Sequence, residues 1–284
     1  MIRKFQVFLE LIKFEHSIFA LPFAYLGLFL AERGLPRLRI FIWVTVAMMA
    51  IRTAGMCLNR LIDQPIDEKN PRTQERVKSI ALLSRARIWL ITVIMLSVFI
   101  FSAAQLNQLC LLLTPIPILL IWIYPYLKKI TWLSHFVLGT ILGCAPYAGW
   151  LASRPHGSWI PALLGLTVWS WVSGFDMIYA LQDVDFDRAY HLKSFPVRFG
   201  SSLTILTVRL LHGITIFSLS VLGLSLDMGF WYWAGWFAVV VLIAREHGLV
   251  ARYGLVKINE AFFNMNAWVS VVIFVAVALD LVLD

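Results

Sequence analysis

The chain contains 40 consecutive residues without Asp, Glu, Lys or Arg, from Ile88 to Leu127: IWLITVIMLSVFIFSAAQLNQLCLLLTPIPILLIWIYPYL. About 20 apolar residues cross the hydrocarbon layer of a bilayer, so this stretch is long enough for two spans. Gln105, Asn107 and Gln108 form a polar hinge between the two halves. The stretch therefore predicts an all-α polytopic membrane protein.

The composition of the whole chain supports this prediction. Of the 284 residues, 60% are hydrophobic and only 14% are charged, and the mean hydropathy is +0.80. Soluble domains carry about a quarter charged residues. The composition therefore excludes a disordered chain, a secreted disulfide scaffold and a nucleic-acid-binding domain. Cys57, Cys110 and Cys144 lie in apolar stretches without a CxxC pattern, which is typical of small buried hydrophobic residues.

Further charge-poor stretches flank the long one. They predict seven more helices, at residues 17–31, 40–59, 130–153, 155–175, 199–226, 228–244 and 261–279. We therefore expect nine transmembrane helices in a single domain, residues 1–284. The distribution of Lys and Arg then orients the chain, because cytoplasmic loops retain basic residues. With the N-terminus in the cytoplasm, 18 of the 24 basic residues lie on the inner side and 4 in outer loops.

The acidic residues are concentrated in two inner segments, at about 59–87 and 176–200. These segments hold half of the 16 Asp and Glu residues: Asp63, Asp67, Glu68 and Glu75 in the first, and Asp176, Asp183, Asp185 and Asp187 in the second. The segments follow the second and sixth predicted helices. Since both helices are even-numbered, the two segments are expected on the same face of the membrane.

The first segment places Asn59, Asp63 and Asp67 four residues apart, which puts them on one face of a helix. Pro65 disfavours an unbroken helix through Asp67, so we expect the helix to kink or end there.

The second segment places Asp176, Tyr179, Asp183 and Asp187 on one helix face, with Asp185 pointing away. Asp176 lies about two turns deeper than Asp183, where an unpaired carboxylate is costly. We expect Asp176 to pair with Arg52 or Arg209, or to orient a ligand.

Two such rows of carboxylates indicate a cation site, because acids four residues apart repel one another unless a cation bridges them. Oxygen ligands without nearby His or Cys favour Mg²⁺. The candidate ligands are Asn59, Asp63, Asp67, Asp183 and Asp187, interleaved with Arg60, Lys69, Arg72, Lys128 and Lys129. Acids, Mg²⁺ and cations at the mouth of an apolar bundle suit a diphosphate with a long hydrocarbon tail. The alternative, solvated loop charges, is accepted for Glu68, Glu75, Arg76, Lys78, Arg85 and Arg87.

Three further residues have two interpretations each. Arg52 lies two turns inside the second helix, nearly on the face of Asn59. It is either a snorkelling arginine or an anion-binding group that faces the cavity. Tyr124 and Lys128 are four residues apart and belong either to an interfacial belt or to the same site.

The six histidines form no metal spacing, and only His16, at the mouth of the first span, is a further candidate.

These motifs resemble those of the UbiA-type membrane prenyltransferases. That family has an NDxxDxxxD-like motif, here Asn59–Asp67, and a YDxxYA-like segment followed by DxxxD, here within Phe175–Asp187. Further similar stretches are Tyr124–Lys129 and Lys193–Gly200. Glu15–Pro22 and Arg52–Met56 are similar to the 4-hydroxybenzoate polyprenyltransferase branch. Arg60 departs from the pattern, because the family commonly has Asp there and an arginine cannot bind metal.

The resemblance implies nine helices around a central cavity, and Mg²⁺-dependent transfer of a polyprenyl group from polyprenyl diphosphate to an aromatic acceptor, most simply 4-hydroxybenzoate in ubiquinone-type quinone biosynthesis. Asp63, Asp67, Asp183 and Asp187 would be catalytic, and with Asn59 would hold Mg²⁺. Arg72, Lys128 and Lys69 would stabilise the diphosphate, and Arg52 or Lys129 would bind the acceptor's carboxylate. Tyr124, Asp176 and Tyr179 complete the substrate site, and Asp183 or Asp187 would act as the base.

The resemblance further implies a multi-pass protein of the inner (plasma) membrane whose active site faces the cytoplasm, with the bilayer and the two substrates as partners and no nucleic acid. One alternative is a naphthoate-type acceptor in menaquinone biosynthesis. Another is a secondary transporter with an acid-lined path. Transporters place acids near the membrane midplane, whereas both segments here lie at one face, which favours the enzyme.

Overall fold

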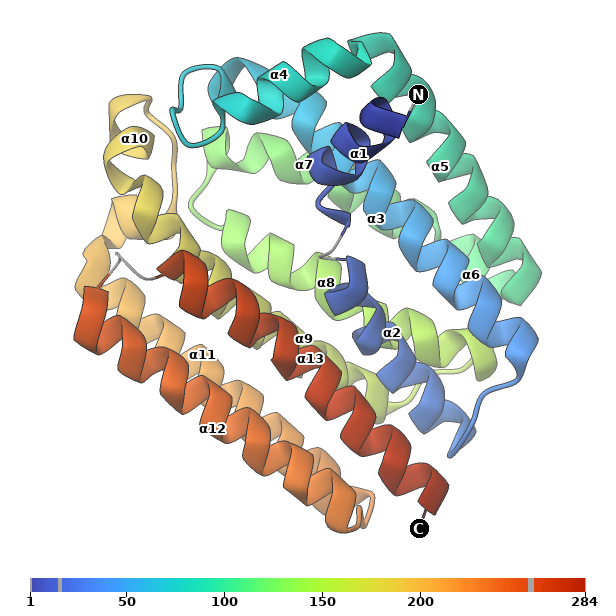
Figure 1. Cartoon of the computed structure of the whole chain (residues 1–284). Coiled ribbons are helices and arrows are strands. Elements are labelled where there is room, and N and C mark those ends of the chain that lie inside the picture. Colours follow the sequence, from blue (N-terminus) through green and yellow to red (C-terminus); the bar gives the residue numbers. More distant parts are fainter. Residues whose placement is uncertain (1, 15–16, 255–257, 284) are drawn as a thin grey trace.

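The computed structural model describes residues 2–14, 17–254 and 258–283, and within these ranges the regular elements are all helices (Figure 1). This confirms the all-α class. The helices are α1 (Ile2–Leu11), α2 (Ser17–Glu32), α3 (Leu38–Asp67), α4 (Gln74–Leu83), α5 (Arg85–Leu106), α6 (Gln108–Leu113), α7 (Pro115–Ile130), α8 (Ser134–Ser153), α9 (Trp159–Ala180), the 3-10 helix η2 (Leu181–Asp183), α10 (Val184–Ala189), α11 (Phe195–Ser225), α12 (Phe230–Tyr253) and α13 (Ile258–Leu283).

Six helical stretches in the described part of the chain are long and apolar enough to cross a membrane. They are residues 38–67, 85–106, 108–130, 134–153, 195–225 and 230–252. Two shorter apolar helices, 20–32 and 268–283, and the 22-residue helix α9 occupy the remaining predicted positions. Each of the nine predicted stretches therefore coincides with helical structure, while the number of actual spans stays a prediction.

The predicted polar hinge lies between α5 and α6. Asn107 is extended, with φ −165° and ψ 170°, and its side chain accepts a hydrogen bond from the Cys110 amide. Its amide group also donates to the Leu151 carbonyl at 2.8 Å. The side chain of Asn107 thus caps the start of α6 and also binds a carbonyl in the last turn of α8.

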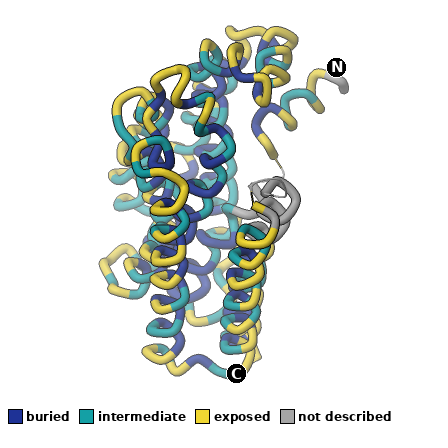
Figure 2. The backbone as a smooth tube through the Cα atoms, turned by 90° about the vertical axis from the view of Figure 1, so that its left-hand side faces the viewer, coloured by how far each residue is buried: buried dark blue, intermediate teal, exposed yellow. Residues whose placement is uncertain are grey.

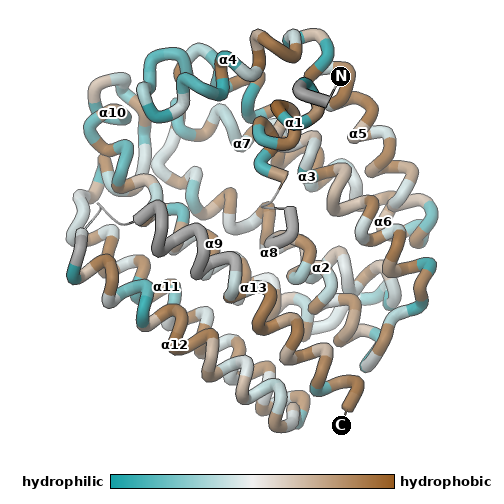
Figure 3. Tube along the Cα trace, in the orientation of Figure 1, coloured by the Kyte–Doolittle hydropathy of each residue, from teal (hydrophilic) through white to brown (hydrophobic). Residues whose placement is uncertain are grey.

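The polar residues gather at the end of the bundle that carries α4 and α10, opposite the C-terminus (Figure 3). Helix α3 explains how this end is reached. Its 30 residues extend about 45 Å, whereas the hydrocarbon layer is about 30 Å thick. The last turns of α3, which carry the first aspartate segment, therefore extend beyond the apolar layer.

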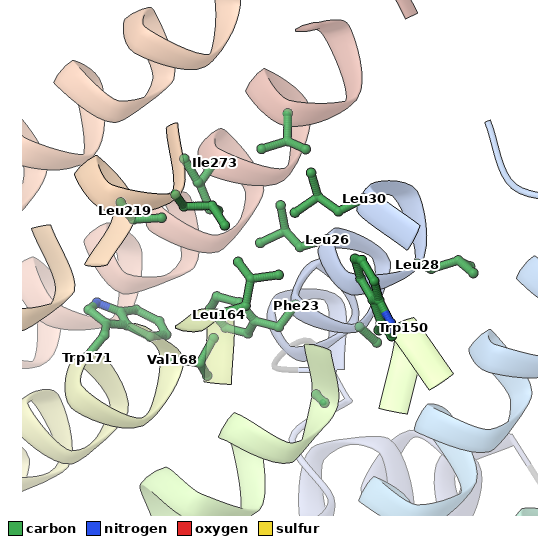
Figure 4. Close-up of a cluster of buried hydrophobic side chains, with 14 of the residues drawn as sticks. Phe23, Leu26, Leu28, Leu30, Trp150, Leu164, Val168, Trp171, Leu219 and Ile273 are labelled. Atoms are coloured by element: carbon green, nitrogen blue, oxygen red, sulfur yellow. The ribbon is translucent and has the colours of Figure 1, made fainter. Parts of the chain in front are cut away.

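The apolar core lies between α2, α8, α9, α11, α12 and α13. Phe23, Leu26, Trp171, Leu219 and Ile273 belong to it (Figure 4). Helices α2 and α8 approach closely at two glycines, since a Cβ on Gly27 or Gly149 would lie 1.9 Å from a carbonyl oxygen of the facing helix. Buried residues face the bundle interior, and exposed ones line its outer surface (Figure 2). This packing holds the helices that carry the second aspartate segment in a fixed position.

Candidate functional site

The two aspartate segments meet at the polar end of the bundle. Arg72, in the loop after α3, binds the Asp183 carboxylate with both Nε and Nη2, the Nε bond measuring 3.0 Å. Its Nη1 donates to the Tyr179 hydroxyl at 2.5 Å, and its guanidinium lies over the Tyr179 ring. Contacts across more than 100 residues of sequence thus place both segments in one site, as the helix count predicted.

The first segment lies on one continuous helix. Helix α3 passes through Pro65, which is exposed, and its final residue is Asp67. The helix therefore continues through Pro65, which was not expected, and it ends at Asp67, as predicted. Asn59 Nδ2 donates to Asp63 Oδ2 at 2.7 Å, so these two side chains are on the same face. Asp67 is buried, and one of its oxygens accepts a long bond of 3.5 Å from Arg76.

The second segment is not one helix, in contrast to the prediction. Helix α9 ends at Ala180, η2 makes a single tighter turn, and α10 begins at Val184. Asp183 and Asp187 are nevertheless both buried, at 7% and 2% exposed, and Asp185 is exposed, as the spacing predicted. The tighter turn changes the direction of the chain but keeps the two aspartates inside.

Two groups at this end, Asp187 and Arg72, have shifted pKa values. Burial raises the pKa of the Asp187 carboxyl above its usual value, and the nearby Lys128 cation opposes this shift. For Arg72, burial acts to lower the pKa of the guanidinium, but the bonds to Asp183 and Tyr179 outweigh it, so that the pKa lies above its usual value. Arg72 is therefore a permanent cation beside the aspartates.

The carboxylates fit a hard cation by their chemistry. Asp67 Oδ2 and Asp187 Oδ2 are buried and lack a hydrogen-bond partner. A buried carboxylate oxygen without a partner is costly, and an oxygen-binding ion such as Mg²⁺ would remove that cost. In the described part of the chain, no three Asp, Glu, His or Cys side chains converge closely enough to hold a metal by themselves. Each segment thus contributes one free oxygen rather than a preformed cluster.

A cavity of about 710 Å³ extends from this end into the bundle. Asn59, Arg60, Arg76, Asp176 and Tyr179 line its polar end. The rest of the wall is mostly apolar and comes chiefly from α3, α5, α6, α7 and α8, with Val44, Ala47, Phe99, Leu113, Ile116 and Leu142 among its residues. The cavity therefore joins a charged site to a space suited to hydrocarbon.

Two arginines of α3 hold the C-terminal end of α1 against this cavity. Arg60 is buried and donates to the Leu11 carbonyl at 3.1 Å, and Arg52 donates to the Ile12 carbonyl at 3.4 Å. Arg60 also donates to Asn59 Oδ1 at 3.2 Å, so the Asn59 side chain is bonded on both sides. Arg60, at the position where the family commonly has aspartate, thus binds one backbone carbonyl of α1 and orients Asn59.

The remaining basic candidates lie in two different environments. Lys128 is close enough to Asp63, Asp176, Asp183 and Asp187 to interact with their charges, and its carbonyl accepts a 2.6 Å bond from the Lys193 amide. Lys69 and Lys129 are instead exposed. Lys69 lies over the ring of Tyr190 and Lys129 over the ring of Tyr126. Neither of these two residues lines the cavity.

Tyr124, Asp176 and Tyr179 all line the cavity, as does Arg52. The expected pairing of Asp176 with Arg52 or Arg209 is wrong. Asp176 Oδ2 is instead 2.6 Å from Nδ1 of His135, on the neighbouring helix α8. Arg52 instead donates to the Ile12 carbonyl, and Arg209 is close enough to His247 for its charge to act on that histidine.

Sequence reasoning missed two residues of this site. His135 is a lone histidine 41 residues from Asp176, and no spacing connects them. Arg76 was assigned to solvated loop charges, but it lines the cavity and contacts Asp67. No helical spacing links Arg76 to Arg72, because Arg72 lies in the loop before α4. Glu15 and His16, at the mouth of the first predicted span, lie outside the described residues.

Comparisons with known proteins identify the family of this chain. The sequence pattern of the UbiA prenyltransferase family matches residues 20–269. The apo structure of a UbiA homolog from Aeropyrum pernix K1 is similar to this chain with a TM-score of 0.85 and 29% identity, over 94% of this chain and 98% of that one. The 4-hydroxybenzoate octaprenyltransferase of Xanthomonas euvesicatoria pv. vesicatoria (strain 85-10) is 30% identical over 89% of this chain and 83% of its own.

A UbiA homolog from Archaeoglobus fulgidus, solved bound to GPP and Mg²⁺, shares the fold with a TM-score of 0.67 and 17% identity, over 96% of this chain and 99% of its own. The family match covers most of the chain, and its fold is the one described above. The chain therefore belongs to the UbiA prenyltransferase family.

Proposed function

We propose that this enzyme transfers a polyprenyl group from polyprenyl diphosphate to 4-hydroxybenzoate, in the presence of Mg²⁺. One observation carries the proposal. A mostly apolar cavity of about 710 Å³ reaches the point where two aspartate segments meet, and each segment has a buried carboxylate oxygen without a partner. An amphiphile with an anionic head and a hydrocarbon tail matches both parts.

The diphosphate would lie at the polar end. Mg²⁺ held by Asn59, Asp63, Asp67, Asp183 and Asp187 would neutralise its charge. Arg72 and Lys128 are the cations placed to stabilise the diphosphate as it leaves, since Arg72 presents a planar guanidinium and Lys128 lies among the acids. Lys69 and Lys129, being exposed, would act on the approach of the substrate instead.

The apolar wall of the cavity has two functions in this proposal. It holds the prenyl tail, and it keeps water from the allylic cation that forms when the diphosphate leaves. A cation that met water would give the alcohol instead of the prenylated ring.

The acceptor would enter beside Arg52. This side chain lines the cavity, and among the described residues its hydrogen bond is the long one to the Ile12 carbonyl. A guanidinium binds a carboxylate with two parallel bonds, which supports an aromatic acid as the acceptor. The 4-hydroxybenzoate octaprenyltransferases among the relatives support 4-hydroxybenzoate as that acid.

The surroundings of the enzyme are part of the proposal. We infer one domain over residues 1–284, nine spans, a cytoplasmic N-terminus and an active site on the cytoplasmic face of the inner membrane. The distribution of basic residues supports this orientation, because most of them lie at the end that holds the site.

The test is an assay of the purified chain with geranyl diphosphate, MgCl₂ and a panel of aromatic acids that includes 4-hydroxybenzoate and a dihydroxynaphthoate. We expect prenylated 4-hydroxybenzoate from the wild type and none from Asp63→Ala or Asp183→Ala. Asp185→Ala, at an exposed aspartate of the same segment, is the matched control and is expected to retain activity.

Each other outcome has a defined meaning. If only the naphthoate were prenylated, the proposed acceptor would change from 4-hydroxybenzoate to a naphthoate, and the proposed prenyl transfer would stand. No prenylated product with any acid, together with solute uptake into proteoliposomes, would overturn the enzyme proposal in favour of a transporter.

A further inference from the structure

His135 and Asp176 form a buried pair beside the cavity. His135, at the start of α8, is fully buried, and its Nδ1 is 2.6 Å from Asp176 Oδ2 of α9. Asp176 lines the cavity, and its side chain is 18% exposed. The buried imidazole of His135 on α8 is thus paired with the carboxylate of Asp176 on α9, which faces the cavity.

The backbone fixes the tautomer of His135. The amide of Phe195, the first residue of α11, donates to His135 Nε2 at 3.3 Å. Such an amide has no partner within its own helix, so it is available to the imidazole. Because Nε2 accepts this bond, the proton of the neutral ring is on Nδ1 and is donated to Asp176.

This arrangement leaves one oxygen of Asp176 for the cavity. Within the described residues, Oδ2 takes the histidine bond and no hydrogen bond to Oδ1 occurs. Asp176 itself lines the polar end of the cavity. An ionised carboxylate with one oxygen fixed and the other open is suited to accept a proton from a bound molecule.

The location of Asp176 matches the place where the reaction occurs. Asn59 and Asp176 both line the polar end of the cavity, so Asp176 is near the diphosphate end. Asp183 and Asp187, the other carboxylates considered as the base, do not line the cavity, and Arg72 binds Asp183.

We propose that Asp176 accepts the ring proton of the aromatic acceptor and that His135 is the positioning residue that orients its carboxylate. This rests on the proposed function. The C–O bond of the prenyl diphosphate breaks and the diphosphate keeps the electron pair. The ring carbon ortho to the hydroxyl forms the new C–C bond. The electrons of its C–H bond return to the ring as the proton passes to Asp176 Oδ1 and then to water at the polar end.

The test uses the full chain with geranyl diphosphate, MgCl₂ and 4-hydroxybenzoate deuterated at both positions ortho to the hydroxyl. Three substitutions separate the functions of His135. Asn keeps a donor at the position of Nδ1, Gln keeps an acceptor at the position of Nε2, and Leu keeps neither. His156→Asn, at an exposed histidine beyond the other end of α8, is the matched control.

We expect Asp176→Asn to lower kcat by about 10²- to 10⁴-fold, the usual contribution of a general base. His135→Leu and His135→Gln should lower kcat by about 10- to 100-fold, the usual loss when a residue that orients a functional side chain is replaced. His135→Leu and His135→Gln should both show a primary deuterium isotope effect, because removal of the ring proton becomes the slow step. His135→Asn should remain within about threefold of the wild type, and KM for geranyl diphosphate should not change in any variant.

Three results would overturn the inference. They are equal losses in the Asn, Gln and Leu variants, losses without an isotope effect, and an Asp176→Asn variant with wild-type kcat. The proposed function fails separately, when the wild type prenylates no aromatic acid at all. If the wild type prenylates another acid of the panel, the same comparison is made with that acid deuterated on its ring.

Discussion

The two aspartate segments have the same sequence spacing but different backbones. The first lies on the unbroken end of α3, whereas the second is divided among α9, η2 and α10. Their side chains nevertheless reach the same arrangement. In each segment one aspartate is bonded, Asp63 by Asn59 and Asp183 by Arg72, while the next keeps a buried oxygen without a partner.

This comparison indicates what the site requires. A continuous helix is not needed, because η2 changes the backbone of the second segment without exposing Asp183 or Asp187. The common feature is one free carboxylate oxygen per segment at a shared polar end. A cation that binds both segments would make the two different backbones equivalent in function.

Removal of Mg²⁺ should have the largest effect, since it would remove the cation that we propose both segments bind. Treatment with EDTA should lower prenyl transfer by more than about 10³-fold, because loss of a single stabilising donor already costs about 10²- to 10³-fold in comparable sites. The measurement is prenylated product per unit time, and restored MgCl₂ should restore it. Activity that persists in EDTA would show that the carboxylates act without a cation.

The second expected effect separates the buried from the exposed aspartate of α10. Asp187→Asn should lower kcat by about 10²- to 10³-fold, because the neutral amide lacks the negative charge of the carboxylate and has one ligand oxygen instead of two. Asp185→Asn should stay within about twofold of the wild type. If both variants lost activity equally, the second segment would depend on its total charge and not on the buried oxygen.

The third effect concerns the arginine that joins the segments. Arg72→Gln removes the bonds to Asp183 and a cation of the site, so KM for geranyl diphosphate should rise by about 10- to 100-fold. Arg76→Gln loses only a 3.5 Å contact with Asp67 and should raise KM by less than about fivefold. A larger effect for Arg76 would indicate that the diphosphate lies on the first segment alone.

The smallest effect tests the continuity of the first segment. Pro65 lies in the last turns of α3 and lacks the amide that would bond to the Leu61 carbonyl. Pro65→Ala should therefore keep activity and raise the free energy of unfolding by up to about 1 kcal/mol, about 2–4 °C in thermal midpoint. A loss of activity without a loss of stability would show that the proline itself shapes the site.

The fold and the location of the site could be predicted from the sequence because each depends on a local property. The uncharged stretch Ile88–Leu127 predicts helices in lipid, and helix parity brings the segments to one face. The spacing of Asp183 and Asp187 predicted that Asp185 points away from them. It could not reveal the η2 turn, since a four-residue spacing fits either backbone.

The contacts between helices could not be predicted, because they depend on packing. Nothing near His135 in the sequence indicates that its neighbour in space is Asp176, or that the Phe195 amide sets its tautomer. Arg60 could be seen as a departure from the family pattern, but only the fold shows that it holds the Leu11 carbonyl at the end of α1.

The most direct test of the account is the binding of geranyl diphosphate to the purified protein by calorimetry, with and without MgCl₂. We expect binding by the wild type only when Mg²⁺ is present, and none by Asp63→Asn or Asp183→Asn, one from each segment. Asp185→Asn should bind as the wild type does. Equal binding without Mg²⁺, or binding that survives the loss of either segment's aspartate, would contradict the claim that the two segments form one cation-dependent site.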